Sequence, residues 1–388
     1  MKKKSPLFKF AVILLAILIP AGVIIGVGYH MLNNALRSNL TDDQIAARNA
    51  MFELIRNLPD HRLTIADTDD IENLNLPTLT NVMILGIDFD GQTRRADTII
   101  IASYDAETNE IALLSIPRDL RITWDEHVRY LIDNHTNPRE LPSHSVRFTN
   151  GDYRVSIQNN NVNVNAIWHF LGPAYGVPIT QAQIERMLGL PRIHYYIVLE
   201  MDGFIEIIDE VGGVYFNVPR RMYHVHAPDQ FGIYLNIDLH PGYQLLTGQQ
   251  ALDLVRYRGT PRADLDRIEV QRDFLEYVIP QLLSLDNIFL NLFSYITAVS
   301  NYMETNATIQ DIWNYARQIR EHDNELTFRS YTLPIILATN GGHVYVNPGP
   351  ANNLIQSIFF SHTIIDEMPI DTLPNAEADE NNEDNNDE

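Results

Sequence analysis

The residue types best suited to chemistry lie in a stretch that opens with Arg256 and Arg258. A Gly-Thr-Pro break follows them, and beyond it Asp264, Arg267 and Gln271 are three and four residues apart. On a helix these three side chains would share one face. Arginine forks match phosphate oxygens, and a carboxylate among them suits a divalent cation. The stretch therefore predicts an anion site, with a salt-bridge network on a helix surface as the alternative.

The elements that must position a second polar group are three predicted strands. Residues 81–87 form a continuous apolar run. Residues 98–104 and 111–116 flank the polar turn Glu-Thr-Asn, which is typical of a β-hairpin. Because hairpin strands are antiparallel, the start of the first strand lies beside the end of the second.

Five charged residues stand at these strand ends. Asp88 ends the first strand, Arg95 and Asp97 follow in a predicted loop, and Arg118 and Asp119 come directly after the hairpin. The antiparallel pairing makes Asp97 and Arg118 predicted neighbours. A second constellation of arginines and aspartates therefore accompanies the first.

The composition excludes several classes of chemistry. The chain has 388 residues, a formal net charge of −22 and no cysteine. The acidic balance argues against binding nucleic acid through the overall field of the protein. The lack of cysteine removes thiolate nucleophiles, disulfides and cysteine-based metal sites. Arginines that are concentrated in parts of an acidic chain must therefore act through local contacts and not through the overall charge of the protein.

The N-terminal part has the pattern of a membrane anchor. Residues 10–32 contain an apolar run long enough to cross a bilayer as a transmembrane helix, behind a lysine-rich cytoplasmic segment at 1–9. The positive charges predict that the N-terminus is inside and the rest outside, while a cleaved signal peptide is the alternative. Residues 33–79 are acidic and mixed, with one short helix predicted, and are interpreted as an extracytoplasmic stalk.

The remainder predicts one large α/β or α+β domain at about 80–350, because no Pro/Gly/Ser-rich linker divides it. Residues 124–162 are polar, lack a firm period and are interpreted as an irregular insertion. Residues 351–388 form a C-terminal extension whose acidic end is expected to be disordered.

Several arginines and aspartates in one site suit a phosphate or pyrophosphate held by arginine, with Mg²⁺ held by aspartate. Phosphoryl transfer depends mainly on positioning and charge neutralisation, which these residue types supply. The chain has no phosphate-binding P-loop, His-Glu-x-x-His motif or Ser/His/Asp order. His224 and His226 are a spaced pair that is more often solvated than metal-binding.

A joint set of motifs resembles the LytR-CpsA-Psr family over roughly residues 81–350. The motifs occur in the order of the family and at compatible spacing, and they are Arg95-Ala-Asp97-Thr98, Ile116-Pro117-Arg118-Asp119, Asn165-Ala166 with Gly172-Pro173, Asp209 with Val211-Gly212-Gly213-Val214, Gly248 with Ala251-Leu252, Val255-Arg256-Tyr-Arg258, Asp264, and Arg267 to Gln271. Each block alone is a weak signal, and the combination is specific.

The resemblance implies a mixed sheet flanked by helices, and a phosphotransferase of the bacterial cell membrane whose catalytic domain is extracytoplasmic. It would move a glycopolymer, such as teichoic acid or capsule, from an undecaprenyl-pyrophosphate carrier onto peptidoglycan, with the polyprenyl chain in an apolar groove between sheet and helices. It implies Mg²⁺ or Mn²⁺ as cofactor. The roles that it implies are catalytic for Asp97, Arg118, Arg256, Arg258 and Arg267, substrate-binding for Arg95, Asp119 and Gln271, and metal-binding for Asp88, Asp97 and Asp264.

Two alternatives remain: a membrane-anchored polyprenyl-pyrophosphate hydrolase or carrier-binding protein, and a regulatory protein of the cell envelope. The chain also departs from the family pattern at three positions. Asn163 replaces a lysine, Asp266 a glycine and Val270 an arginine. These changes remove positive charge and add negative charge, so anion binding would weaken unless Arg262 or Arg272 compensates.

Overall fold

The computed structural model describes residues 40–59, 79–89, 94–137, 139, 141–142, 146–149, 152–155, 162–225, 236–257, 259, 264–284, 300–322, 325–337 and 344–360. The predicted cytoplasmic segment, the anchor at 10–32 and the acidic tail lie outside these residues. Within the described ranges, no helix combines the length and the apolar character that crossing a membrane requires.

A six-stranded mixed sheet forms the centre of the molecule, in the order β13-β8-β1-β2-β3-β14. Its central strands β1, β2 and β3 are antiparallel, whereas β8 is parallel to β1 and β14 is parallel to β3. The strands are β1 (Leu79–Phe89), β2 (Arg94–Asp105), β3 (Glu110–Ser115), β8 (Tyr195–Glu200), β13 (Met303–Thr305) and β14 (Thr327–Thr332). The predicted mixed sheet flanked by helices is confirmed.

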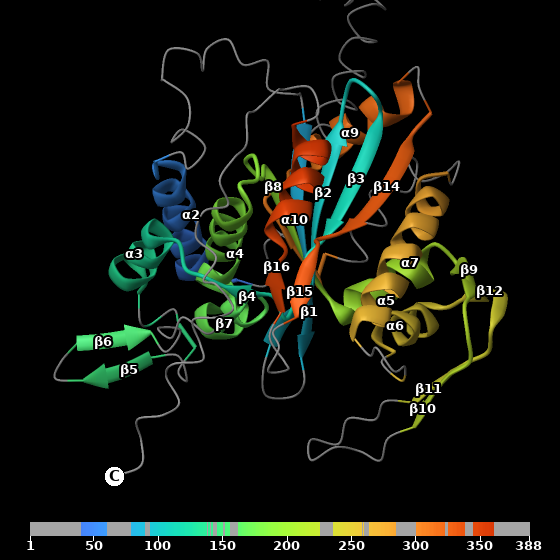
Figure 1. The fold of residues 1–388 in the computed structure, drawn as a ribbon, viewed down its shortest axis with the longest axis horizontal. Helices are drawn as coiled ribbons and strands as arrows, with labels where there is room; N and C mark the ends of the chain where they lie inside the picture. The colour runs from blue at the N-terminus through green and yellow to red at the C-terminus, as the bar shows by residue number, and fades with distance from the viewer. Residues whose placement is uncertain are drawn as a thin grey trace, which may run out of the picture.

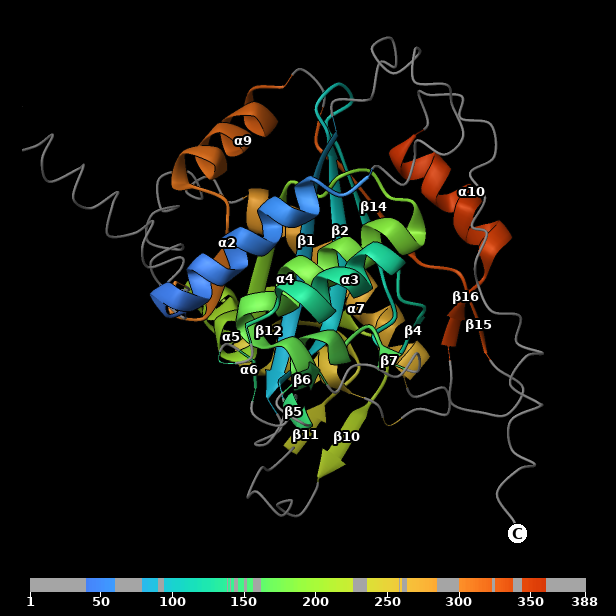
Figure 2. The same cartoon turned by 90° about the vertical axis from the view of Figure 1, so that its left-hand side faces the viewer.

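Helices cover both faces of this sheet, with α2, α3 and α4 on one side and α5, α6 and α7 on the other (Figure 1). Figure 2 looks onto the first layer, in which α2 lies across α4 in front of β1 and β2. The helices are α2 (Asp42–Arg56), α3 (Glu126–His135), α4 (Ala166–Leu188), α5 (Met201–Glu210), α6 (Gly248–Arg256), α7 (Asp264–Ser284), α9 (Ile309–Glu321) and α10 (Pro348–Phe359).

Five small two-stranded ribbons complete the described fold. They pair β4 (Arg121–Ile122) with β7 (Val162–Asn163), β5 (Val146–Thr149) with β6 (Asp152–Val155), β9 (Val214–Val218) with β12 (Gly242–Leu246), β10 (Met222–Val225) with β11 (Asn236–Leu239), and β15 (Ile335–Leu337) with β16 (Val344–Val346). Buried side chains of β9 to β12, α5, α6 and α7 form an apolar cluster distinct from the larger one around the sheet and α4.

The predicted hairpin is confirmed, and several local predictions are corrected. Arg94 to Asp97 belong to β2 rather than to a loop, because Arg94, Arg95 and Ala96 pair with the last residues of β1. The sequence also predicts a helix at 245–254, and in the structure this helix begins only at Gly248, because residues 245 and 246 complete strand β12. The sequence predicts a long helix that is kinked or broken near Pro280, and α7 continues past this proline to Ser284.

Three further predictions are corrected by the structure. The region 124–162 is not wholly irregular, because it contains α3, whose apolar face is buried, and three short strands. Two predicted helices in the region 165–188 are joined as α4 across a kink at Gly172, whose φ of 62° favours glycine. The sequence predicts Asp202 as the cap of the helix that follows β8, but Asp202 lies in the first turn of α5 and Glu200 holds the cap position, without a side-chain cap bond.

Helix α2 lies in the region interpreted as a stalk, and it packs tightly against the domain. Arg48 is 2% exposed and forms an ion pair with Glu304 on β13. Its guanidinium also donates to the Tyr196 hydroxyl and to the Pro173 carbonyl. Burial lowers the pKa of Arg48, and its interaction with Tyr196 partly opposes that effect. A buried charge held by three elements fixes α2 in place.

Replacing Arg48 alone is expected to destabilise the fold strongly. Arg48→Met leaves the Glu304 carboxylate, whose side chain is 6% exposed, buried without its ion-pair partner. The loss in unfolding free energy should be about 3–5 kcal/mol, measured by urea denaturation. The double variant Arg48→Met/Glu304→Leu should recover part of it. Arg56→Met on the same helix removes an exposed pair with Glu53 and should change stability by less than about 1 kcal/mol. Equal losses in Arg48→Met and Arg56→Met would contradict the role of the buried pair.

Candidate active site

A β-bulge in β2 determines which side chains face the candidate site. Strand β1 pairs Gly86 with Thr98 and Ile87 with Ala96, so Asp97 is an extra residue without a partner in β1. A bulge changes the face to which the following residues point. Thr98 and Asp97 are adjacent and would point to opposite faces of a regular strand, but because of the bulge both line the same cavity.

The bulge thereby collects charged residues of two strands on one face of the sheet. On β1 the regular alternation directs Ile84, Gly86 and Asp88 to this cavity. On β2 the alternation of side chains between the two faces shifts by one residue at the bulge, so that Arg95 lines the cavity together with Asp97. A Cβ at Gly86 would lie 3.0 Å from the Thr98 Cβ, so the glycine permits close approach at this point.

Arg118 and Asp97 are neighbours, as the hairpin predicts. Their ion pair joins Nη1 to Oδ2 at 2.6 Å, with only 16% and 15% of the two side chains exposed. Asp119 stands behind this pair, its Oδ2 3.5 Å from the Arg118 Nε, rather than on the cavity wall. Partial burial excludes water and strengthens the attraction.

Asn165, at the start of α4, holds the bulge and Arg118 together through its backbone. Its carbonyl accepts from the Ala96 amide at 3.4 Å, and its amide donates to the Arg118 carbonyl at 3.2 Å. The Asn165-Ala166 motif thus acts as a brace between two segments that are distant in sequence. This positioning role was not predicted from the sequence, because backbone bonds leave no signal in residue type.

Helices α6 and α7 supply the opposite wall of the cavity. A capping box formed by Thr247 and Gln250 starts α6, and Arg256 is its last residue. The Arg256 Nη2 lies 3.1 Å from the Asp88 Oδ2. Gln271 of α7 donates from Nε2 to the carbonyl of Val255 at 3.0 Å, which ties the end of α6 to α7. Gln271 therefore positions Arg256 as well as lining the cavity.

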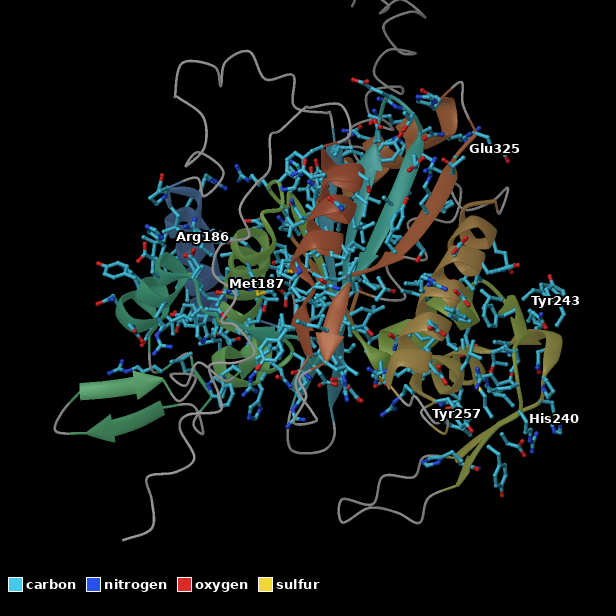
Figure 3. All side chains as sticks on the ribbon, viewed as in Figure 1. Arg186, Met187, His240, Tyr243, Tyr257 and Glu325 are labelled. Atoms are coloured by element: carbon cyan, nitrogen blue, oxygen red, sulfur yellow. The ribbon has the colours of Figure 1, made fainter. Side chains whose placement is uncertain are left out.

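The remaining predicted site residues divide into two groups. Arg267 lines the cavity and is 4% exposed. Arg258 and the side chain of Asp264, the first residue of α7, lie outside the described residues. Figure 3 places Tyr257, which follows Arg256, on the same side of the sheet as α5 and α6.

Two titratable cavity residues were not assigned to the site from the sequence. His224 of β10 lines the cavity, although the sequence favoured a solvated side chain, while His226 lies outside the described residues. Glu200 also lines it and forms an ion pair with Arg94, Oε1 to Nη1 at 2.6 Å. Their separation in sequence from the arginine motifs left no local signal for either.

The cavity, of about 630 Å³, changes from charged to apolar along the strands. Asp88 and Ile84 are four residues apart on β1, which is roughly 13 Å of extended chain. Ile84 pairs with Ile100, so the end of the cavity remote from Asp88 is apolar on both strands. Further apolar lining comes from Leu199, Phe204, Ile237, Leu252, Val255, Phe274 and Leu275. The shape and polarity suit an amphiphile with an anionic head.

The departures from the family pattern find local explanations in two cases. The carboxylate of Asp266, a buried residue, lies 3.8 Å from Arg220, which offsets its negative charge. Val270 packs against the apolar cluster of α6 and α7. Of the two arginines expected to compensate, Arg272 pairs with Asp273, and Arg262 lies outside the described residues. Asn163 accepts a hydrogen bond from Arg121 at 3.4 Å.

The carboxylate oxygens at this end of the cavity suit a magnesium ion that also binds the phosphate oxygens of a substrate. Asp88 and Asp97 supply hard oxygen donors from adjacent strands at the charged end of the cavity. Among the described residues, no group of three or more His, Asp or Glu side chains could hold a metal. Mg²⁺ typically takes one or two carboxylates, with substrate phosphates and water completing its octahedron. The side chain of the third predicted ligand, Asp264, lies outside the described residues.

The fold and the site define a mixed α/β protein whose cavity runs from an arginine and aspartate cluster into an apolar lining. The chain belongs to the LytR_cpsA_psr family, whose family model matches residues 60–357. The resemblance seen in the sequence motifs is thereby confirmed.

Individual relatives are distant. The chain is 26% identical over 253 residues to the polyisoprenyl-teichoic acid–peptidoglycan teichoic acid transferase TagU of Enterococcus faecalis, covering 64% of this chain and 68% of that protein. An uncharacterised Staphylococcus aureus protein is 26% identical over 258 residues, covering 63% and 53%. This chain thus spans about half to two thirds of the length of such relatives.

Solved structures support the fold. A Streptococcus agalactiae protein matches with a TM-score of 0.54 and 19% identity, over 72% of this chain and 87% of the other. TagV of Bacillus subtilis matches with a TM-score of 0.50 and 22% identity, over 76% and 98%. At this level of identity the likeness shows the architecture alone.

Asp253 of α6 should make stability depend on pH. The residue is 9% exposed and its Oδ1 accepts from Gln249 at 2.9 Å. Burial raises the pKa of Asp253, while the Gln249 bond and the Arg256 charge partly oppose the shift. A carboxyl with a raised folded pKa stabilises the protein below its unfolded pKa and loses that contribution as pH rises through the folded pKa.

Asp253→Asn should therefore raise the melting temperature at pH 7, and the gain should shrink as pH falls through the raised folded pKa and be lost below the unfolded pKa of about 4. Scanning calorimetry across that range measures both effects. Asp238→Asn, on an exposed side chain of β11, is the matched control and should shift the melting temperature little at any pH. A gain in Asp253→Asn that persists unchanged at low pH would contradict the assignment.

Proposed function

We propose that this protein is an extracytoplasmic phosphotransferase of the bacterial cell membrane, which transfers a glycopolymer from a polyprenyl-pyrophosphate carrier to peptidoglycan. The observation that carries the proposal is the single cavity in which an apolar lining leads into the arginine and aspartate cluster. A polyprenyl pyrophosphate has the same sequence of parts, with an apolar chain followed by an anionic head. The name of the TagU relative, a polyisoprenyl-teichoic acid–peptidoglycan teichoic acid transferase, agrees with this substrate pair.

The arginines bind and neutralise the pyrophosphate. Arg118, Arg256 and Arg267 line the charged end, and their forks can hold phosphate oxygens in bidentate fashion. Asp97 and Asp88 hold two of these arginines through the ion pairs at 2.6 and 3.1 Å. The arginines are therefore oriented before substrate arrives, which is the condition for efficient electrostatic stabilisation of a transition state.

The transfer exchanges one phosphorus–oxygen bond for another. An acceptor hydroxyl oxygen attacks the phosphorus that carries the glycopolymer, and the bond from that phosphorus to the bridging oxygen breaks. The bridging oxygen leaves with the lipid as a polyprenyl monophosphate, which takes up the proton lost by the hydroxyl. The arginine cluster stabilises the charge that grows on the leaving phosphate.

Magnesium is proposed as the cofactor, with Asp88 and Asp97 as its protein ligands and Asp264 as a predicted third. When bound, the ion supplies neutralisation of the phosphate oxygens. Residues 10–32 are proposed to anchor the chain, with the N-terminus inside, which would keep the cavity near a membrane-bound donor.

Arg118→Ala should lower kcat/KM by about 10²–10³-fold, because it removes a preorganised donor to the developing charge. The assay mixes the purified protein with a polyprenyl-pyrophosphate sugar and peptidoglycan fragments, and measures release of the lipid monophosphate. Arg129→Ala changes an arginine of α3 that pairs with Asp133 away from the cavity, and should leave turnover unchanged. Activity within twofold of wild type in Arg118→Ala would refute the role of this arginine.

Chelation of divalent ions should abolish turnover, and Mg²⁺ or Mn²⁺ should restore it. Asp88→Asn and Asp97→Asn should each raise the Mg²⁺ concentration for half-maximal activity, because they remove a charged ligand. Full activity in the chelated protein would exclude the metal assignment. Binding of the lipid without cleavage, even with Mg²⁺ and peptidoglycan fragments present, would favour the carrier-binding alternative.

A further inference from the structure

A second cavity, of about 660 Å³, adjoins the first behind the Asp88–Arg256 ion pair. Both of these residues line both cavities, as do Glu200, Met201 and Leu252. The second cavity extends over α5 and α6 to strand β11 and takes in Asp202, Ile205, Asn236, Gln249 and Asp253. A molecule in this cavity would meet a phosphate in the first across the shared wall.

The lining of the second cavity has more acidic than basic side chains, unlike a site that binds anions. Of its described residues, Asp88, Glu200, Asp202 and Asp253 are acidic, against the two arginines Arg94 and Arg256. Each of these arginines already forms an ion pair with a carboxylate of the same lining. The excess of carboxylates disfavours a second phosphate group, because like charges in a partly enclosed space repel.

Apart from Asp88, a proposed Mg²⁺ ligand in the shared wall, these carboxylates are not grouped around one point. The described part of the chain holds no cluster of three acidic or histidine side chains that could bind a metal. The carboxylates are instead spread over β1, β8, α5 and α6, together with the amides of Asn236 and Gln249. Dispersed acceptors and amides suit a ligand that carries many hydroxyl donors at intervals.

Asp253 is the most deeply placed of these acceptors. It is nine-tenths buried, and among the described residues Gln249 is the hydrogen-bond donor seen on its carboxylate, through Oδ1. Its second oxygen therefore has capacity for a donor from within the cavity. A ligand hydroxyl in the cavity could donate to this oxygen.

We propose that the second cavity is the acceptor site, which binds an uncharged saccharide and presents one of its hydroxyls to the phosphate across the Asp88–Arg256 wall. This inference rests on the proposed function, since a transferase must hold two substrates side by side. The positively charged cavity takes the donor, and the negatively charged one takes the sugar. Asp253 and Gln249 position the saccharide and do not touch the donor.

Direct binding tests this assignment without requiring turnover. The full-length protein in detergent is titrated calorimetrically with the N-acetylglucosamine tetramer, a neutral saccharide, and separately with Mg²⁺ and inorganic pyrophosphate. Asp253→Asn and Gln249→Ala should each weaken tetramer binding about tenfold, as expected for a lost hydrogen bond to a buried polar group, and leave pyrophosphate binding unchanged. Arg267→Ala, which changes the first cavity only, should do the reverse.

The control variant is Asp238→Asn, which makes the same chemical change on β11 outside both linings and should alter neither titration. Failure of the wild-type protein to bind the tetramer at millimolar concentration would overturn the inference, as would equal binding in Asp253→Asn and wild type. Because Asp253→Asn keeps the shape of the side chain and its bond to Gln249, a loss of binding is not explained by unfolding; its melting temperature confirms this.

The two proposals can fail separately. If water cleaves the lipid donor while the protein neither binds a saccharide nor transfers to one, the acceptor-site assignment is refuted and the donor-site assignment is kept. Saccharide binding that depends on Asp253, in a protein that never cleaves a polyprenyl pyrophosphate, would support the second cavity and overturn the phosphotransferase proposal.

Discussion

The constraint on which the site depends is the β-bulge at Asp97. A regular strand would have sent Thr98 and Asp97 to opposite faces of the sheet, one toward the cavity and the other toward the core under α4. The bulge places both on the cavity side and lets Arg95 follow. Arg118 can then reach Asp97 from the end of β3, and the Asn165 backbone fixes both segments.

The two faces of the sheet have different roles: one buries the larger apolar cluster and the other lines the cavities. One face packs on α4 and its neighbours and buries the larger apolar cluster, including Leu85, Ile87 and Ile99. The other face is left partly open under α5, α6 and α7, where the cavities lie. The Arg48–Glu304 pair ties α2 to the sheet, so that the chain closest to the predicted anchor is part of the rigid body.

Charge is distributed locally in a chain whose formal net charge is −22. Arg118 and Arg256 are each held by an aspartate that is itself a proposed metal ligand, so arginine orientation and metal binding are coupled. The Asp88–Arg256 pair also stands between a cavity rich in arginine and a cavity rich in carboxylates. Opposite fields on the two sides of one wall would sort an anionic donor from an uncharged acceptor.

The sequence by itself determined the hairpin, the Asp97–Arg118 contact, the arginine motifs and the family, because these depend on local alternation, turn residues and short-range spacing. It did not reveal that Arg94 to Asp97 continue β2, since the polar residues there resemble a turn and only pairing with β1 makes them a strand. The order β13-β8-β1-β2-β3-β14, the second cavity, and the places of His224, Glu200, Asp253 and Asn165 were decided by tertiary structure alone. These features join residues that are far apart in the chain, and contacts of that kind arise from packing and backbone hydrogen bonds that no local pattern encodes.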